Sequence, residues 1–447
     1  MERSHYSPAL FVIRALTIAV ATLVSAAPGP ARAQQSNKLG FKVGDKSRLH
    51  LNLTVSSAFD SNSQRRASDI QGTEDVRLIV RPGLALDVPG RSLELRLGLG
   101  TTIGQFFGAG SASGSDTTFG LDSNIFLRVG SRKSTVSFQI ENSPMLTPTV
   151  LPEVGTVGTD ERLFPAFTDR GKLFLTFRPG GGALEFDVGY KNLFVAYTRD
   201  SATNDAPDDG FLNKGFLEAR LKFLPKTAAV FYADFGAFDV GAPSGRTPGT
   251  LESNPFSVLV GLIGQITRTI SAEVRAGYAE TLVWTPDGGR FGTTDPANQR
   301  TVVGLASVGW QIIKTAKVSL TYQRDLQPTV ALSSFITDAI RLRGNWNIDR
   351  LLLGAYGEVQ FRDFGTQASG MPPMTENPDL LEPSSTLIFG GVRADYFFLD
   401  WLTGGLNYRV MVQDSNDDAR LFNGSVFVPA LGSFDRHVVL ANVGVRY

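Results

Sequence analysis

The sequence predicts an all-β protein, a transmembrane up-and-down antiparallel β-barrel of about eighteen strands, with about sixteen as the alternative count. Two independent regularities lead to this fold class. Apolar and polar residues alternate in segments of about ten, which is the period of a strand with two chemically different faces. The connections between these segments are alternately short and long, as in barrels of the bacterial outer membrane.

The composition excludes several other classes. The chain has 447 residues, with 43 Lys and Arg against 43 Asp and Glu, and no Cys. Nucleic-acid-binding proteins usually carry an excess of Lys and Arg, and this chain has no such excess. The absence of Cys excludes disulfide scaffolds and thiolate metal sites. The hydrophobic fraction of 42% is too high for a disordered polymer, yet no apolar run reaches the roughly 18 residues of a membrane helix.

The first residues have the pattern of a secretory signal. Arg3 and Arg14 precede an apolar run from Ala15 to Ala27, and the sequence Ala-Arg-Ala ending at Ala33 supplies a cleavage site before Gln34. We therefore expect residues 1–33 to be removed, residues 34–47 to form a periplasmic N-terminal segment and residues 48–447 to form the barrel. An uncleaved anchor is the alternative, and the run is short for a membrane span.

The alternation is clearest between Leu93 and Ile103, where leucines occupy one face and Glu94, Arg96 and glycines occupy the other. The same pattern recurs along the whole chain. The expected strand centres lie near residues 54, 81, 98, 124, 138, 174, 188, 218, 232, 260, 275, 307, 320, 342, 356, 392, 407 and 442.

Every second connection is short and rich in turn-forming residues. Short turns are expected around Pro89-Gly90, Gly130-Ser131, Pro179-Gly180, Pro225-Lys226, Thr267-Arg268-Thr269, Lys314-Thr315, Asp349-Arg350 and Asp400-Trp401. The intervening connections are long and polar. Aromatic residues collect at the short-turn ends of the strands, which predicts an interfacial girdle of Phe177, Phe223, Trp310, Trp346, Tyr396, Phe398 and Trp401.

A closed sheet is the physical consequence of placing such strands in lipid. Backbone amides in hydrocarbon have no water to bond, so a sheet crosses a bilayer only if it closes on itself. A soluble β-sandwich is the alternative. A soluble sheet of this size would seldom have a uniformly apolar face on one side and this much glycine and charge on the other. A solenoid would show a fixed repeat of about 20 to 30 residues, and none occurs in the sequence.

The C-terminal segment, Val439 to Tyr447, alternates apolar residues and finishes on an aromatic residue. It resembles the terminal signature of outer-membrane barrels, with Tyr447 in the usual place of Phe. The resemblance implies that Val443, Gly444, Val445 and Tyr447 form an assembly signal read by the barrel-assembly machinery.

A narrower resemblance rests on Ser57 to Asn62 followed by Arg81 to Leu86, and on Tyr408-Arg409 followed by Asp414 to Asn416. Together with the ending, these residues resemble the β-barrel porin family associated with exopolysaccharide secretion. The resemblance implies a location in the bacterial outer membrane, surrounded by its lipid, and export of a polysaccharide delivered by a periplasmic component. A general diffusion porin, or a non-conducting barrel whose external loops bind or adhere, are the alternatives.

A barrel of this width holds an aqueous channel rather than a filled core. The alternation assigns charged residues of both signs to the inner wall, which predicts cross-strand ion pairs and weak charge selectivity. Inward aromatics that could stack on sugars are Phe126, Tyr232, Tyr356, Phe389 and Phe397. The expected pore-lining residues are Arg77, Arg81, Glu94, Arg96, Asp122, Arg128, Glu185, Asp187, Lys191, Glu218, Arg220, Lys222, Glu273, Arg275, Arg341, Arg343, Arg393, Asp395 and Arg409.

The third long connection, Ser143 to Gly171, resembles the loop that folds into many porins and narrows them. That resemblance makes Glu153, Asp160, Glu161 and Arg162 candidate constriction residues, with an exposed loop as the alternative. Catalysis and cofactors are not expected. After signal removal only His50 and His437 remain, and the topology puts them at opposite rims, so neither a shared catalytic site nor a metal-ligand cluster is predicted.

Overall fold

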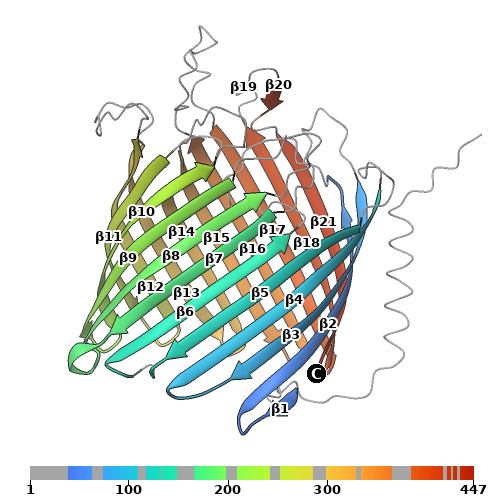
Figure 1. Cartoon of the computed structure of the whole chain (residues 1–447), viewed down its shortest axis with the longest axis horizontal. Helices are drawn as coiled ribbons and strands as arrows, with labels where there is room; N and C mark the ends of the chain where they lie inside the picture. Colours follow the sequence, from blue (N-terminus) through green and yellow to red (C-terminus); the bar gives the residue numbers. More distant parts are fainter. Residues whose placement is uncertain are drawn as a thin grey trace, which may run out of the picture.

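The computed structural model describes residues 39–62, 74–108, 117–131, 133–147, 166–197, 209–241, 252–284, 299–328, 334–364, 384–415, 420–423, 426–429 and 433–447. Within these residues the chain forms one large antiparallel barrel of strongly tilted strands (Figure 1). The expected signal segment and its cleavage site after Ala33 lie outside the described residues.

Eighteen strands make up the barrel wall, which confirms the predicted fold class and the higher strand count. Every predicted strand centre falls inside one of them. The wall consists of β2 (Ser47–Asp60), β3 (Asp75–Val88), β4 (Leu93–Gly108), β5 (Thr117–Val129), β6 (Val136–Thr147), β7 (Ala166–Phe177), β8 (Leu184–Tyr197), β9 (Asp209–Leu224), β10 (Thr227–Gly241), β11 (Glu252–Gln265), β12 (Ile270–Trp284), β13 (Arg300–Ile313), β14 (Ala316–Pro328), β15 (Ser334–Ile348), β16 (Leu351–Phe364), β17 (Ser384–Leu399), β18 (Leu402–Ser415) and β21 (Phe434–Arg446).

Three short strands were not expected from the sequence. β1 (Phe41–Val43) pairs with the start of β2, and β19 (Arg420–Asn423) pairs with β20 (Val426–Pro429) between β18 and β21. Each is too short to show a readable alternation. The strands also extend into the predicted third connection, Ser143 to Gly171, because β6 ends at Thr147 and β7 begins at Ala166.

Each wall strand pairs antiparallel with its neighbour in sequence, and β2 pairs with β21 to close the barrel. At the closure, Leu51 and Tyr447 exchange two backbone hydrogen bonds of 2.9 and 2.8 Å. The ring of Phe41 on β1 packs on that of Tyr447, with centroids 4.7 Å apart. The C-terminal residue is therefore fixed between the first two strands of the chain, at the lower end of the barrel in Figure 1.

The short turns all lie at that same lower end, as predicted (Figure 1). Gly130 begins one of them with a φ of 91°, a conformation that costs a glycine little. Asp349 in the two-residue turn between β15 and β16 adopts a φ of 48°, which aspartate tolerates better than most residues. Tight turns of this kind fix the register of the strands that they join.

The outward face of the wall is apolar. Val302 near the start of β13 is 67% exposed, and Val260 and Leu342, near the middle of β11 and β15, are 58% and 52% exposed. Six of the predicted girdle residues are exposed near the short-turn ends of their strands, namely Phe177, Phe223, Trp310, Trp346, Tyr396 and Trp401, and Phe398 packs edge-on against Tyr396. In the part of the chain that the structure describes, no helix has the length and hydropathy needed to span a membrane.

Candidate functional site in the barrel lumen

The charged faces of the strands point to the concave side of the barrel. Arg275 on β12 reaches Glu218 on β9, with 3.4 Å between Nη1 and Oε2, although two strands separate β9 from β12. Side chains on a convex surface diverge, so a contact that bridges two intervening strands requires the inner wall. Alternation then places the other charged residues of these strands on the same wall.

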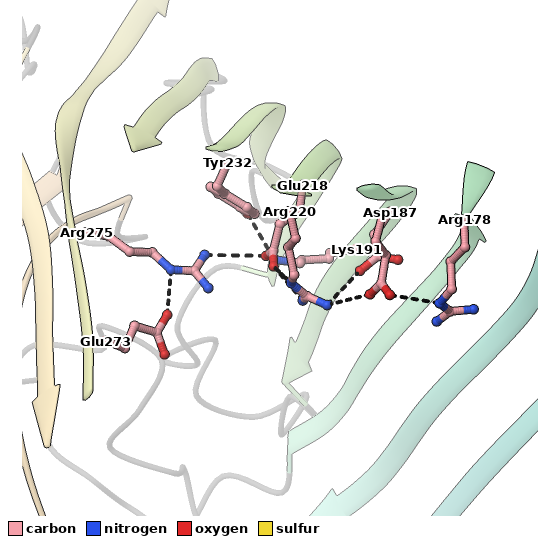
Figure 2. Close-up of polar contacts among 9 residues, drawn as sticks. Arg178, Asp187, Lys191, Glu218, Arg220, Tyr232, Glu273 and Arg275 are labelled. Atoms are coloured by element: carbon pink, nitrogen blue, oxygen red, sulfur yellow. Dashed lines mark hydrogen bonds and ion pairs between the residues drawn. The ribbon is translucent and has the colours of Figure 1, made fainter. Parts of the chain in front are cut away.

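A chain of ion pairs crosses this inner wall from β7 to β12 (Figure 2). Arg178, just after β7, bonds Glu185 at 2.7 Å, and Glu185 also lies 2.8 Å from Arg220. Arg220 continues to Glu218 at 2.5 Å and to Asp187 at 3.6 Å. The chain ends at Glu273, which lies 2.5 Å from Arg275.

A second cluster lies on β4 and β5. Glu94 pairs with both Arg96 and Arg128, and each guanidinium also lies over the ring of Phe126, at 4.9 and 5.8 Å from its centroid. Such a cluster combines charge pairing with cation–π contact. The wall is thus cross-linked in several places by alternating charges.

Further ion pairs lie elsewhere on the wall. Arg341 on β15 and Glu358 on β16 are 2.7 Å apart, and Arg393 pairs with Asp395 within β17. Six of the predicted residues make no ion pair in the described part of the chain, namely Arg81, Asp122, Lys191, Lys222, Arg343 and Arg409. All nineteen predicted residues lie on described strands, and their role as pore lining remains a prediction.

Arg77 belongs to a different kind of site. Asp60 on β2, whose side chain is 1% exposed, accepts Arg77 of β3 at 3.0 Å and Arg436 of β21 at 2.6 Å. These three strands are the ones that meet at the closure of the barrel. The cluster therefore joins the first and last wall strands by buried charge pairing rather than facing open solvent.

A cavity of about 830 Å³ opens on the inner wall between β7 and β14. Its lining includes three lysines, Lys172, Lys191 and Lys214, together with Tyr232, Asp234 and Arg275. Apolar residues such as Leu259 and Val303 complete it. The barrel is thus hollow in this sector, next to the ion-pair chain of Figure 2.

Sequence reasoning named Lys191 and Tyr232 but missed Lys172, Lys214 and Asp234. Lys172 was missed because the third long connection was predicted to end at Gly171, directly before it. In the structure β7 begins six residues before Lys172. Extending the alternation backwards from Leu175 and Leu173 would have assigned Lys172 to the inner wall.

The candidate constriction residues Glu153, Asp160, Glu161 and Arg162 lie outside the described residues. His50 lies on β2 with Nε2 3.4 Å from Asp87, whereas His437 lies at the start of β21 and stacks on Tyr408. The two histidines are therefore on different parts of the wall. No group of three or more metal-ligating side chains gathers in the described ranges.

No protein-family model matches the sequence, and no curated protein matches it. Solved structures overlap most of the chain. OpdQ of Pseudomonas aeruginosa is 10% identical with a TM-score of 0.41, covering 90% of this chain and 98% of OpdQ. OccK11 (OpdR) of the same organism is 14% identical with a TM-score of 0.41, covering 93% and 100%. OccAB4 of Acinetobacter baumannii is 11% identical with a TM-score of 0.42, covering 92% and 100%. Likeness at this level defines neither the family nor the function of the chain.

Proposed function

We propose that this chain is a channel of the bacterial outer membrane that lets small polar solutes pass through a water-filled lumen. One observation supports the proposal above all others. The sheet is closed, its outer face is apolar, and its inner face carries ion pairs and a cavity of about 830 Å³.

The outer face fits lipid. Each wall strand has 12 to 16 residues, more than the roughly 9 to 11 that a tilted strand needs to cross the hydrocarbon core. Closure between β2 and β21 gives every wall strand a partner on both sides, which hydrocarbon requires. Exposed residues such as Val302 and Leu342 would each gain roughly 1.5 to 3 kcal/mol on leaving water.

The inner face fits water. Eighteen strands enclose more space than side chains fill, and most of the acidic residues on the wall are matched by Arg. Opposite charges at contact distance cancel much of each other's field, so the lumen as a whole should discriminate weakly between cations and anions. These properties favour general diffusion over transport of one charged solute.

Polysaccharide export is the second candidate. The rings of Tyr356 and Phe389 lie 6.5 Å apart on the inner wall, and Phe126 adds a third aromatic surface on which sugars could stack. In this proposal the polymer and a periplasmic export component are partners. Deleting the gene and measuring surface polysaccharide discriminates the two candidates, since an unchanged amount argues against export.

Maturation of the chain and a constriction by its third long connection are further parts of the proposal. The secretory signal is cleaved after Ala33, and the barrel-assembly machinery reads the ending from Val443 to Tyr447. N-terminal sequencing of the protein recovered from outer membranes tests the cleavage. Changing Glu153, Asp160, Glu161 and Arg162 together to Ala is expected to alter single-channel conductance if that loop narrows the lumen.

The direct experiment is conductance. The purified protein, inserted in a planar lipid bilayer, is expected to give stable ion currents that change little when the salt cation or anion is replaced. A protein that inserts correctly but passes no ions would overturn the proposal and favour a closed barrel with a binding or adhesive role.

A further inference from the structure

We propose that the lumen contains a binding site for a small organic carboxylate with an apolar body, built around Lys172, Lys191 and Lys214. This inference deepens the proposed channel function by naming a class of solute that pauses in the lumen. It differs from the weak selectivity of the lumen as a whole, because it concerns one local site.

The three lysines form a row across three adjacent strands. In the strand register Lys172 of β7 lies opposite Lys191 of β8, and Lys191 lies opposite Lys214 of β9. Neighbouring strands are about 4.8 Å apart, so three ammonium groups are confined to one short arc of the wall. Like charges placed directly opposite each other destabilise a sheet.

Carboxylates of the protein relieve only part of this repulsion. Glu141 lies opposite Lys172 in the strand register and Asp325 lines the same cavity, but in the described residues neither makes an ion pair with the row. Lys214 lies 3.6 Å from Asp234, but Asp234 also accepts hydrogen bonds from Tyr232 at 2.7 Å and from Ser257 at 2.8 Å. Within the described ranges, neither Lys172 nor Lys191 has a carboxylate at ion-pair distance. The row therefore keeps excess positive charge.

Aromatic rings hold the amines in place. Lys172 Nζ lies 4.5 Å from the ring centroid of Phe174 and 5.2 Å from that of Phe216. Lys191 Nζ lies 4.7 Å from Phe216 and 5.0 Å from Tyr232, and it donates a 3.0 Å hydrogen bond to the Tyr232 hydroxyl. Cation–π contacts of this kind position an ammonium without neutralising its charge.

All three lysines line the 830 Å³ cavity, which also has an apolar side. That side includes Leu212, Phe238, Leu259 and Val303. An anion that only paired with lysines would leave these side chains facing water. A carboxylate on a compact apolar body fits both sides of the cavity. Its oxygens accept hydrogen bonds from the lysine ammonium groups, and its body covers the apolar side chains.

The test compares two molecules of nearly equal shape, cyclohexanecarboxylate and the neutral cyclohexylmethanol. Equilibrium dialysis with the full barrel in detergent measures binding without requiring conductance. The wild-type protein is expected to bind the carboxylate at least about tenfold more tightly than the alcohol, a ratio equivalent to 1.4 kcal/mol. The combined variant K172Q/K191Q/K214Q should lose this preference.

A matched control is Lys222→Gln, which removes an inner-wall lysine of β9 outside the row and should leave binding unchanged. Heat-dependent migration in gel electrophoresis checks that each variant forms the barrel, and the single variant K172Q serves if the combined one fails to fold. Equal binding of carboxylate and alcohol by the wild type, or an unchanged preference in the row variants, would overturn the site. A protein that binds in this way but conducts no ions would overturn the channel while leaving the site intact.

Discussion

Two of the charge clusters of this barrel, the one at the closure and the ion-pair chain from β7 to β12, are built alike but lie in different surroundings. At the closure, Asp60 is 1% exposed and holds two Arg side chains that are 13% and 16% exposed. In the lumen, Arg220 is 35% exposed and shares several carboxylates. A buried cluster in which two Arg side chains share one carboxylate holds the strands together, and losing that carboxylate is costly. In a more exposed cluster with several carboxylates, the loss of one changes stability little and mainly changes the local electrostatic field.

The largest effect is expected at the closure. Asp60→Asn removes the buried carboxylate that Arg77 and Arg436 share, which should lower the free energy of unfolding by about 3 to 5 kcal/mol. Urea unfolding in detergent, followed by Trp fluorescence, measures the change. The control Asp87→Asn removes a 42% exposed carboxylate and should cost less than about 1 kcal/mol. Equal losses in both variants would mean that the closure cluster has no special role.

The next effect distinguishes the two faces of a single strand. Val308 faces outward near the middle of β13, and its neighbour Ser307 faces inward beside Thr321. Val308→Arg should cost about 2 to 4 kcal/mol in a bilayer, because it places a charge in hydrocarbon. Ser307→Arg should cost about 1 kcal/mol, the value of one lost hydrogen bond. Folding titrations in lipid vesicles measure both, and a reversed order would contradict the assignment of faces.

The smallest effect on stability is expected in the lumen. Glu185→Gln leaves Arg220 with Glu218 and Asp187, and Arg178 keeps its hydrogen bonds to Ser134 O and Ser137 Oγ, so folding should change little. Removing one negative charge from the inner wall should instead raise the anion-over-cation permeability ratio by about twofold. Reversal potentials in a salt gradient report that ratio. Asp338→Asn, which removes an outward carboxylate bonded to Tyr322, should leave the ratio unchanged.

The wall strands were predictable because each is long and most alternate clearly, as between Leu93 and Ile103. The segments near residues 138, 232 and 320 alternate less clearly, and the regular spacing of the turns supported them. β1 and the β19–β20 hairpin were not, since three or four residues cannot display a period of two. The inward charges followed from alternation alone. The lysine row did not, because its existence depends on the register between β7, β8 and β9, and register is set jointly by turn geometry and pairing.

The closure cluster was unpredictable for a related reason. Asp60 and Arg436 are 376 residues apart in the sequence, and only barrel closure brings them together. Arg77 was assigned to the inner wall by alternation, but no feature of the sequence identified its buried partner. Local patterns thus predicted faces, whereas contacts between distant strands required the three-dimensional structure.

The channel requires that the apolar faces of the strands contact lipid and that the charged faces enclose water. Because the chain contains no Cys, single Cys residues can be introduced at each position from Leu406 to Val412 of β18 and treated in intact cells with a small charged thiol reagent. Labelling is expected at Asn407, Arg409 and Met411, and protection is expected at Leu406, Tyr408, Val410 and Val412. Uniform labelling along the strand, or labelling of the second set alone, would contradict this assignment of faces.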